Sequence, residues 1–207
     1  TDKSQQEGNV QEFPTLIYDG PFSESAEKAE ARGVTGDEVT IDQAREKAQK
    51  VLPEGSTVAS EGESNGDIPA YEFTFTLPDG RLADVSITRK GGDALYMRCT
   101  ATSDVSGIAP EEEAKKIKEI GKTFLSEHGF ENMESTYAQY YSGIAIINFA
   151  ATQNDVILYP DLVKVWVDRA TGTVCGIDAR NYFFSHVDRK LEEPKLTIEE
   201  AENIISD

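Results

Sequence analysis

The residues of this sequence that could do chemistry are many carboxylates, two histidines and two cysteines. The 207 residues include 38 Asp and Glu, whereas the histidines are limited to His128 and His186. A metal site built from several histidines is therefore excluded within one chain, and no His-x-x-x-His pair occurs. Because no Asp-x-Asp-x-Asp-Gly loop occurs either, we interpret the acidic residues as a solubilising surface and predict no metal site.

The sequence offers little to indicate the common enzyme classes. It contains no Walker loop and no dinucleotide-binding Gly-x-Gly-x-x-Gly. The pattern Gly-x-Ser-x-Gly occurs once, at Gly62–Gly66, but this stretch is polar and precedes a predicted strand, whereas a nucleophile elbow lies between a strand and a helix. An acyl hydrolase, a nucleoside triphosphatase and a dehydrogenase therefore have no motif in their favour. A glycosidase needs only two carboxylates at a suitable separation, so a hydrolase that uses a carboxylate pair stays open as an alternative. We predict no catalytic residues and no cofactor.

The two cysteines, Cys99 and Cys175, leave three arrangements open. They could form one disulfide, remain two free thiols or bridge two chains. Neither belongs to a Cys-x-x-Cys motif, which removes the usual sequence grounds for a redox or zinc site. We favour free buried thiols, because cysteine often packs as a small apolar residue.

The charge of the chain limits its partners. The formal net charge is -18, with 38 Asp and Glu against 20 Lys and Arg, so phosphate backbones and anionic membrane surfaces are repelled. No apolar run approaches the ~20 residues of a membrane-spanning helix. We therefore expect no nucleic acid partner, and a targeting or anchoring segment would have to lie outside this sequence.

A helix-start motif occurs three times and predicts how the chain is organised. The copies are Thr40–Ala44, Pro110–Ala114 and Thr197–Ala201. Each places a capping Thr or a Pro before carboxylates in the first turn, which suits the positive end of a helix dipole. Strand-like segments follow the first two copies, so the pattern indicates a repeated module, a helix followed by a sheet.

The first module is predicted over residues 39–106. Its helix carries an apolar stripe that includes Ile41, Ala44 and Ala48. Alternating or β-rich segments, separated by Gly-containing turns, then predict an antiparallel meander. These predicted strands are residues 71–77, 82–88 and 94–99. The polar stretch Ser60–Asp67 could precede the sheet or follow a short first strand, and this point is left open.

The second module is predicted over residues 107–190 on the same plan. Gly121 interrupts the apolar face of its helix at a cost of ~1 kcal/mol, which indicates tight packing against a strand. Pro160 is expected to break regular structure, and Asp168–Gly172 to form a hairpin turn. The predicted strands are residues 133–139, 144–152, 162–167 and 174–177.

The remaining segments are short. We expect residues 1–12 to be a flexible lead-in and residues 13–38 to be an arm with a short helix. Residues 191–207 hold the third helix start without a following sheet, so they are interpreted as the first helix of a truncated third module. An amphipathic helix without its sheet needs another surface, which leaves open a homodimer in which it docks onto a second chain.

Aromatic clusters supply the candidate partner-binding residues. Such clusters usually mark packing, but aromatics beside Arg are also typical of interface hot spots. We expect the aromatics of residues 182–184 to be exposed, next to His186, which could also cap or pair at the module boundary. His128 is interpreted as a donor or cation near a helix C-terminus. The candidate residues are Tyr18, Phe22, Tyr182, Phe183, Phe184, His186 and Arg189.

Taken together, these motifs resemble a known family. The helix-then-sheet module with Asp168–Gly172 in its hairpin resembles the PepSY domain, and the tandem arrangement resembles the YpeB family of spore-germination proteins. The matching segments are residues 13–24, 166–176 and 181–191, followed by Pro194. The resemblance implies an α+β fold of tandem PepSY-like modules, each a helix packed on an antiparallel sheet of three to four strands.

The resemblance also implies a function. Members of this family are non-catalytic germination proteins that are needed for the presence or stability of a partner spore cortex-lytic enzyme, a peptidoglycan hydrolase. They work outside the inner membrane of the spore, at its outer side and the cortex, and carry an N-terminal membrane anchor. This sequence lacks that anchor and most of the last repeat, so it looks like a shortened C-terminal region, with a membrane link only through an anchor outside this chain.

Overall fold

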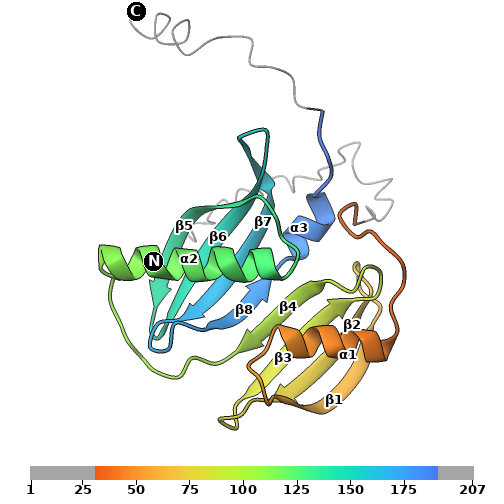
Figure 1. Ribbon diagram of the computed structural model, residues 1–207, viewed down its shortest axis with the longest axis horizontal. Helices are drawn as coiled ribbons and strands as arrows, with labels where there is room; N and C mark the ends of the chain where they lie inside the picture. Colours follow the sequence, from red (N-terminus) through yellow and green to blue (C-terminus); the bar gives the residue numbers. More distant parts are fainter. Residues whose placement is uncertain (1–30, 191–207) are drawn as a thin grey trace, which may run out of the picture.

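The structure, a computed structural model, describes residues 31–190 (Figure 1). The expected lead-in, most of the arm, including Tyr18 and Phe22, and the third helix start therefore lie outside the described residues. The elements in order are α1 (Ile41–Lys50), β1 (Thr57–Ser64), β2 (Ala70–Thr76), β3 (Leu82–Thr88), β4 (Ala94–Cys99), α2 (Glu111–Glu127), β5 (Met133–Tyr141), β6 (Ile144–Gln153), β7 (Val156–Asp168), β8 (Val174–Asp178) and α3 (Arg180–Ser185).

Helix α1 begins where the first copy of the motif predicts. The Thr40 hydroxyl accepts a hydrogen bond from the Gln43 backbone N–H at 3.2 Å, and the Gln43 side chain accepts one from the Thr40 N–H at 2.8 Å. This reciprocal capping box satisfies two backbone donors that the first turn would otherwise leave without partners. The apolar stripe is confirmed, since Ala44 and Ala48 are fully buried against the sheet.

The first module contributes β1 to β4. Strand β1 resolves the point that the sequence left open, because residues 60–64 continue the strand and do not form a loop. Its side chains are mostly exposed, which explains why its polar composition did not indicate a strand. Strand β1 is an edge strand, and its register against β2 shifts between Val58 and Ser60.

The second module contributes β5 to β8, with α2 packed on them. The prediction for Gly121 is confirmed, because a Cβ at this position would lie 2.9 Å from the ring of Phe149 on β6. The prediction for Pro160 holds in part, since β7 runs through this residue while its regular pairing with β6 is interrupted there. Leu158 pairs with Ala151 and Leu162 with Ala150, so the residues between them form a bulge where a missing N–H costs no ladder hydrogen bond.

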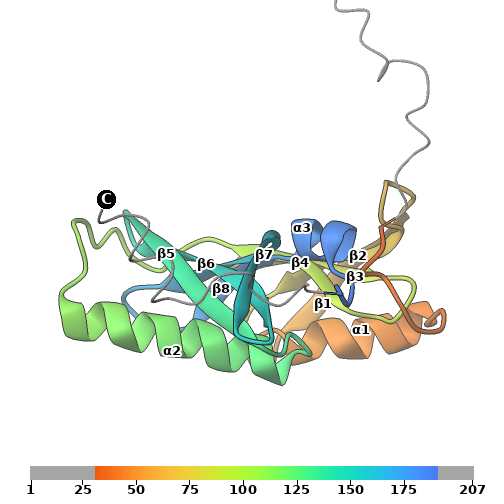
Figure 2. The ribbon, with the colours of Figure 1, turned by 90° about the horizontal axis from the view of Figure 1, so that it is seen from above.

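The two modules share one sheet. Strand β4 pairs with β8, giving an eight-stranded antiparallel sheet in the order β1-β2-β3-β4-β8-β7-β6-β5. Figure 2 shows α1 and α2 on one face of this sheet and α3 on the other. Within the described residues the core is continuous from one module to the other. The α+β class is confirmed, and the edge-to-edge join is an addition that local sequence patterns did not predict.

Candidate functional site

Helix α3 positions the aromatic candidates, and the sequence did not predict it. The carboxylate of Asp178 accepts hydrogen bonds from the backbone N–H and the guanidinium of Arg180 at the start of the helix. The Ala179 N–H donates to the Leu95 carbonyl at 2.9 Å, which holds the helix start against β4. The element therefore begins where β8 leaves the sheet, and it lies over the junction of the two modules (Figure 1).

The expectation that the aromatics of α3 are exposed is wrong. Phe183 is only 4% exposed, and Tyr182 and Phe184 are half-buried against the core. Phe130 meets Tyr182 and Phe183 edge-on, with ring centroids 5.3 and 5.8 Å apart. The Gly33 N–H also donates to the Phe183 carbonyl at 2.8 Å, so the end of the arm packs on this helix. Phe130, Tyr182 and Phe183 therefore form the floor of a site and do not project from it.

A buried carboxylate fixes the segment that follows α3. Asp161 on β7 is fully buried and accepts hydrogen bonds from both terminal nitrogens of Arg189, at 2.5 and 2.8 Å. The His186 Nδ1 lies 3.0 Å from the same carboxylate, and its ring stacks on Tyr182 at 4.3 Å. Burial raises the pKa of Asp161, but the hydrogen bonds from Arg189 and His186 outweigh burial and leave the pKa below its ordinary value.

The candidates His186 and Arg189 are therefore brought together by a residue that the sequence analysis did not select. Asp161 directly follows Pro160, and the expected break at that proline made it resemble a loop residue. The sequence gives only a weak indication that Asp161 belongs to a site, namely an acidic residue between a proline and the β-rich run that begins at Leu162. Its importance becomes clear only in the structure, where the bulge of β7 places the carboxylate in the interior.

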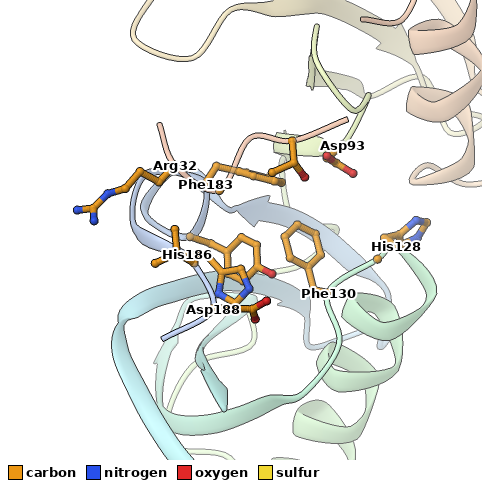
Figure 3. A pocket seen from close by; sticks show the side chains of 12 residues that line it. Arg32, Asp93, His128, Phe130, Phe183, His186 and Asp188 are labelled. Carbon is orange, nitrogen blue, oxygen red and sulfur yellow. The ribbon is translucent and has the colours of Figure 1, made fainter. Parts of the chain in front are cut away.

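A cavity of about 470 Å³ opens between the modules over this helix. Figure 3 shows its labelled side chains, which come from the segment before α1, the start of β4, the end of α2 and the α3 region. Its charged and polar lining residues include Arg32, Asp93, His128, His186 and Asp188, and its aromatic floor is the cluster described above. The cavity therefore exists only because the two modules are joined.

A second depression, of about 520 Å³, continues the cavity toward the β6–β7 hairpin. The two depressions share Gly129, Tyr182, His186 and Asp188, and together we call them the junction groove. Carboxylates dominate the charged side chains that line the junction groove within the described part of the chain. They are Asp93, Glu131, Asp155 and Asp188, against the single guanidinium of Arg32.

Burial shifts the pKa values of Asp93 and His128, which both line the junction groove. Burial raises the pKa of Asp93, and the positive charge of Lys47 opposes this only in part. Burial also lowers the pKa of His128, whose ring packs on Phe124 at 4.4 Å. His128 is the C-cap of α2, where its backbone N–H donates to the last carbonyls of the helix, and the lowered pKa of its ring favours the neutral form over the cation.

The groove can bind a polar or cationic segment, because carboxylates surround an aromatic floor. Burial raises the pKa of Tyr182 to about 12, so its hydroxyl stays protonated and can donate a hydrogen bond. Within residues 31–190, no cluster of three or more His, Cys, Asp or Glu residues could hold a metal ion. None of the helices in this range combines the length and apolar composition that crossing a bilayer requires.

Comparisons with known proteins extend these observations. The family model described as "YpeB sporulation, PepSY1 and PepSY2 domains" matches residues 3–192. Sporulation protein YpeB of Halalkalibacterium halodurans is 29% identical over 165 residues, which are 79% of this chain and 36% of that protein. The Bacillus subtilis (strain 168) protein of the same name is 26% identical over 206 residues, 95% of this chain and 44% of that protein.

A solved structure also resembles this fold. The Bacillus megaterium YpeB C-terminal domain aligns with a TM-score of 0.69 at 25% sequence identity, covering 81% of this chain and 75% of that one. The chain thus spans less than half the length of the curated relatives it matches.

Proposed function

Because this chain belongs to the YpeB sporulation family, we propose that within its role in sporulation and germination it is a non-catalytic module that binds and stabilises a spore cortex-lytic peptidoglycan hydrolase. The observation that carries the proposal is the junction groove, a concave surface that two PepSY modules form together. Because both modules line the groove, the tandem arrangement provides a binding surface that a single module could not form.

The groove suggests which part of the hydrolase would bind. Four carboxylates surround an aromatic floor, so a cationic segment, rich in Lys or Arg, is the complementary occupant. Aromatic faces also favour guanidinium and ammonium groups. The net charge of -18 acts in the same direction over longer distances and would speed the encounter with a basic partner at low salt.

The binding experiment uses the chain and the purified hydrolase. The variant with Asp93→Asn and Asp188→Asn removes two groove charges with little change of shape. The control, with Glu54→Gln and Asp104→Asn, removes two exposed charges outside the groove. We expect about tenfold weaker binding by the groove variant, near-normal binding by the control, and weaker binding of the unchanged chain at high salt. Equal affinity of the two variants, or no binding by the folded chain, would contradict the proposal.

One observation favours the alternative that the chain is itself a peptidoglycan hydrolase. Asp93 and Asp188 line the same cavity, and a carboxyl group with a raised pKa, such as Asp93, is suited to act as a general acid. Incubation of the purified chain with cortex peptidoglycan separates the two functions. Release of muropeptides that disappears with Asp93→Asn would establish the alternative, whereas intact peptidoglycan agrees with a binding role.

The location proposed with this function is the outer side of the inner spore membrane and the cortex. The link to the membrane would come from an anchor outside this chain. Fractionation of spores, followed by detection of the protein with an antibody, tests the location. Recovery in the spore core fraction would contradict it.

A further inference from the structure

Cys99 and Cys175 lie on the two strands that join the modules. Strands β4 and β8 pair antiparallel, with Met97 opposite Ile177 and Arg98 opposite Gly176. The pairing ends at Arg98 and Gly176, and one further step in this register would bring Cys99 opposite Cys175, at the point where β8 bulges against β7. Both side chains are buried and both thiols are free. Residues opposite each other in antiparallel strands have Cα atoms about 4.5–5.5 Å apart, within the range that disulfides span.

The surroundings of the two thiols differ. A hydrogen bond with Cys175 and the nearby positive charge of Arg81 outweigh burial and together lower the pKa of Cys99 to about 7. The Arg81 Nη1 lies 3.8 Å from the Cys99 Sγ. The pKa of Cys175 is raised by its hydrogen bond with Cys99 and by burial. Such a pair places a thiolate beside a second thiol that can resolve a mixed disulfide, and Cys99, 7% exposed against 2% for Cys175, is the more accessible of the two.

We propose that Cys99 and Cys175 are a redox site that closes to a disulfide between β4 and β8 when the protein meets a low-molecular-weight disulfide. The Cys99 thiolate attacks one sulfur of the oxidant, which forms a mixed disulfide and releases half of the oxidant as a thiolate. The Cys175 thiol gives its proton to solvent and attacks the Cys99 sulfur, releasing the other half. The two protein thiols are oxidised, and the oxidant is reduced to two thiols.

The position of the bond gives it a structural effect. Among the described strands, β4 and β8 form the one ladder that connects the modules. Helix α3 and the bond from the Ala179 N–H to the Leu95 carbonyl secure one end of this ladder, and the cysteines lie at the other end. The disulfide would therefore hold the modules in register at the end away from the junction groove.

The experiment treats the folded chain with oxidised glutathione and counts free thiols, alongside mass spectrometry and peptide mapping. We expect the two thiols to disappear, the mass of the monomer to fall by two hydrogen atoms, and one linked peptide pair to contain Cys99 and Cys175. The thermal midpoint should rise by about 5–10 °C relative to the reduced chain. Cys175→Ser should stop at a glutathione adduct on Cys99, and circular dichroism checks that this variant is folded.

Three results would overturn the proposal. They are thiols that stay free in the folded chain and oxidise only in denaturant, a stable glutathione adduct on the unchanged protein, and a bridge between two chains on a non-reducing gel. Should Cys175→Ser fail to fold, peptide mapping of the unchanged chain under native and denaturing conditions still decides between these results.

Discussion

The guanidinium of Arg189 donates hydrogen bonds from both of its terminal nitrogens to the carboxylate of Asp161, at 2.5 and 2.8 Å. Arg189 also donates to the Ser185 carbonyl at 3.0 Å, so one side chain connects the bulge of β7 to the end of α3. The two partners are 28 residues apart in sequence. This ion pair fixes the segment that forms one wall of the junction groove.

Replacement of Asp161 by Asn should destabilise the fold by about 2 kcal/mol, because Arg189 and His186 lose a charged acceptor that is buried. The pKa of Asp161 is lower in the folded chain than its ordinary value of 3.8. Its stabilisation is therefore complete above about pH 4 and is lost as the pH falls through the folded pKa. Urea unfolding between pH 2 and 7 measures this, and Asp155→Asn, an exposed change on the same hairpin, is the control. The same pH dependence in Asp161→Asn would refute the assignment.

Replacement of Asp168 by Asn should loosen the linker between the modules, the segment from β4 to α2 that contains Thr102. The buried carboxylate accepts hydrogen bonds from the Thr102 N–H at 2.6 Å and its hydroxyl at 2.8 Å, as well as from the N–H groups of Ala170 and Thr171. An amide presents an NH₂ group to some of these donors, so we expect a loss of about 2 kcal/mol. Hydrogen exchange at Thr102 should accelerate, whereas the exposed change Asp84→Asn should leave it unaltered. Unchanged protection of Thr102 would show that the linker is held by other contacts.

Replacement of Gly121 by Ala tests which of two opposing effects prevails. Helix propensity alone favours Ala by about 1 kcal/mol, but its Cβ would lie 2.9 Å from two carbons of the Phe149 ring. We expect a net destabilisation of about 1–3 kcal/mol. Thr123→Ala, on the exposed side of the same helix, should be neutral or slightly stabilising in thermal unfolding. Combination with Phe149→Leu should recover part of the loss, and strictly additive effects would argue against a clash.

The thiol of Cys99 should react with a small alkylating reagent at a rate that rises with pH and reaches half its maximum near pH 7, because only the thiolate is nucleophilic. Cys175→Ser weakens the hydrogen bond that contributes most to the lowered pKa, so the midpoint should move to higher pH. Arg81→Gln should move it in the same direction by removing a nearby positive charge. An unchanged midpoint in both variants would mean that other groups set this pKa.

The features that the sequence predicted well depend on neighbours in the chain. The capping residues Thr40 and Gln43 lie three positions apart, and the apolar stripe of α1 repeats within a few turns. Gly121 was recognisable because a helix rarely accepts glycine without a packing reason. Such signals are local, so they can be recognised in the sequence without knowing which surface the element packs against.

The features that the sequence could not predict depend on distant pairs. Strand β4 meets β8 across more than seventy residues, and no local pattern marks one strand edge as the partner of another. The aromatics of α3 resembled an exposed cluster because the surface that buries them comes from β7, β4, Phe130 and the end of the arm, all distant in sequence. The tolerance of Pro160 depends on a bulge that only the register of β6 and β7 reveals.

The join between β4 and β8 also bears on how the protein behaves in concentrated solution. A module folded by itself would present β4 or β8 as an open edge, with a row of unpaired backbone donors and acceptors that invites other chains. In the joined sheet these two edges are paired with each other, and β1, whose exposed side chains include Glu61 and Glu63, forms one of the outer edges. Each module thus protects the other from aggregation.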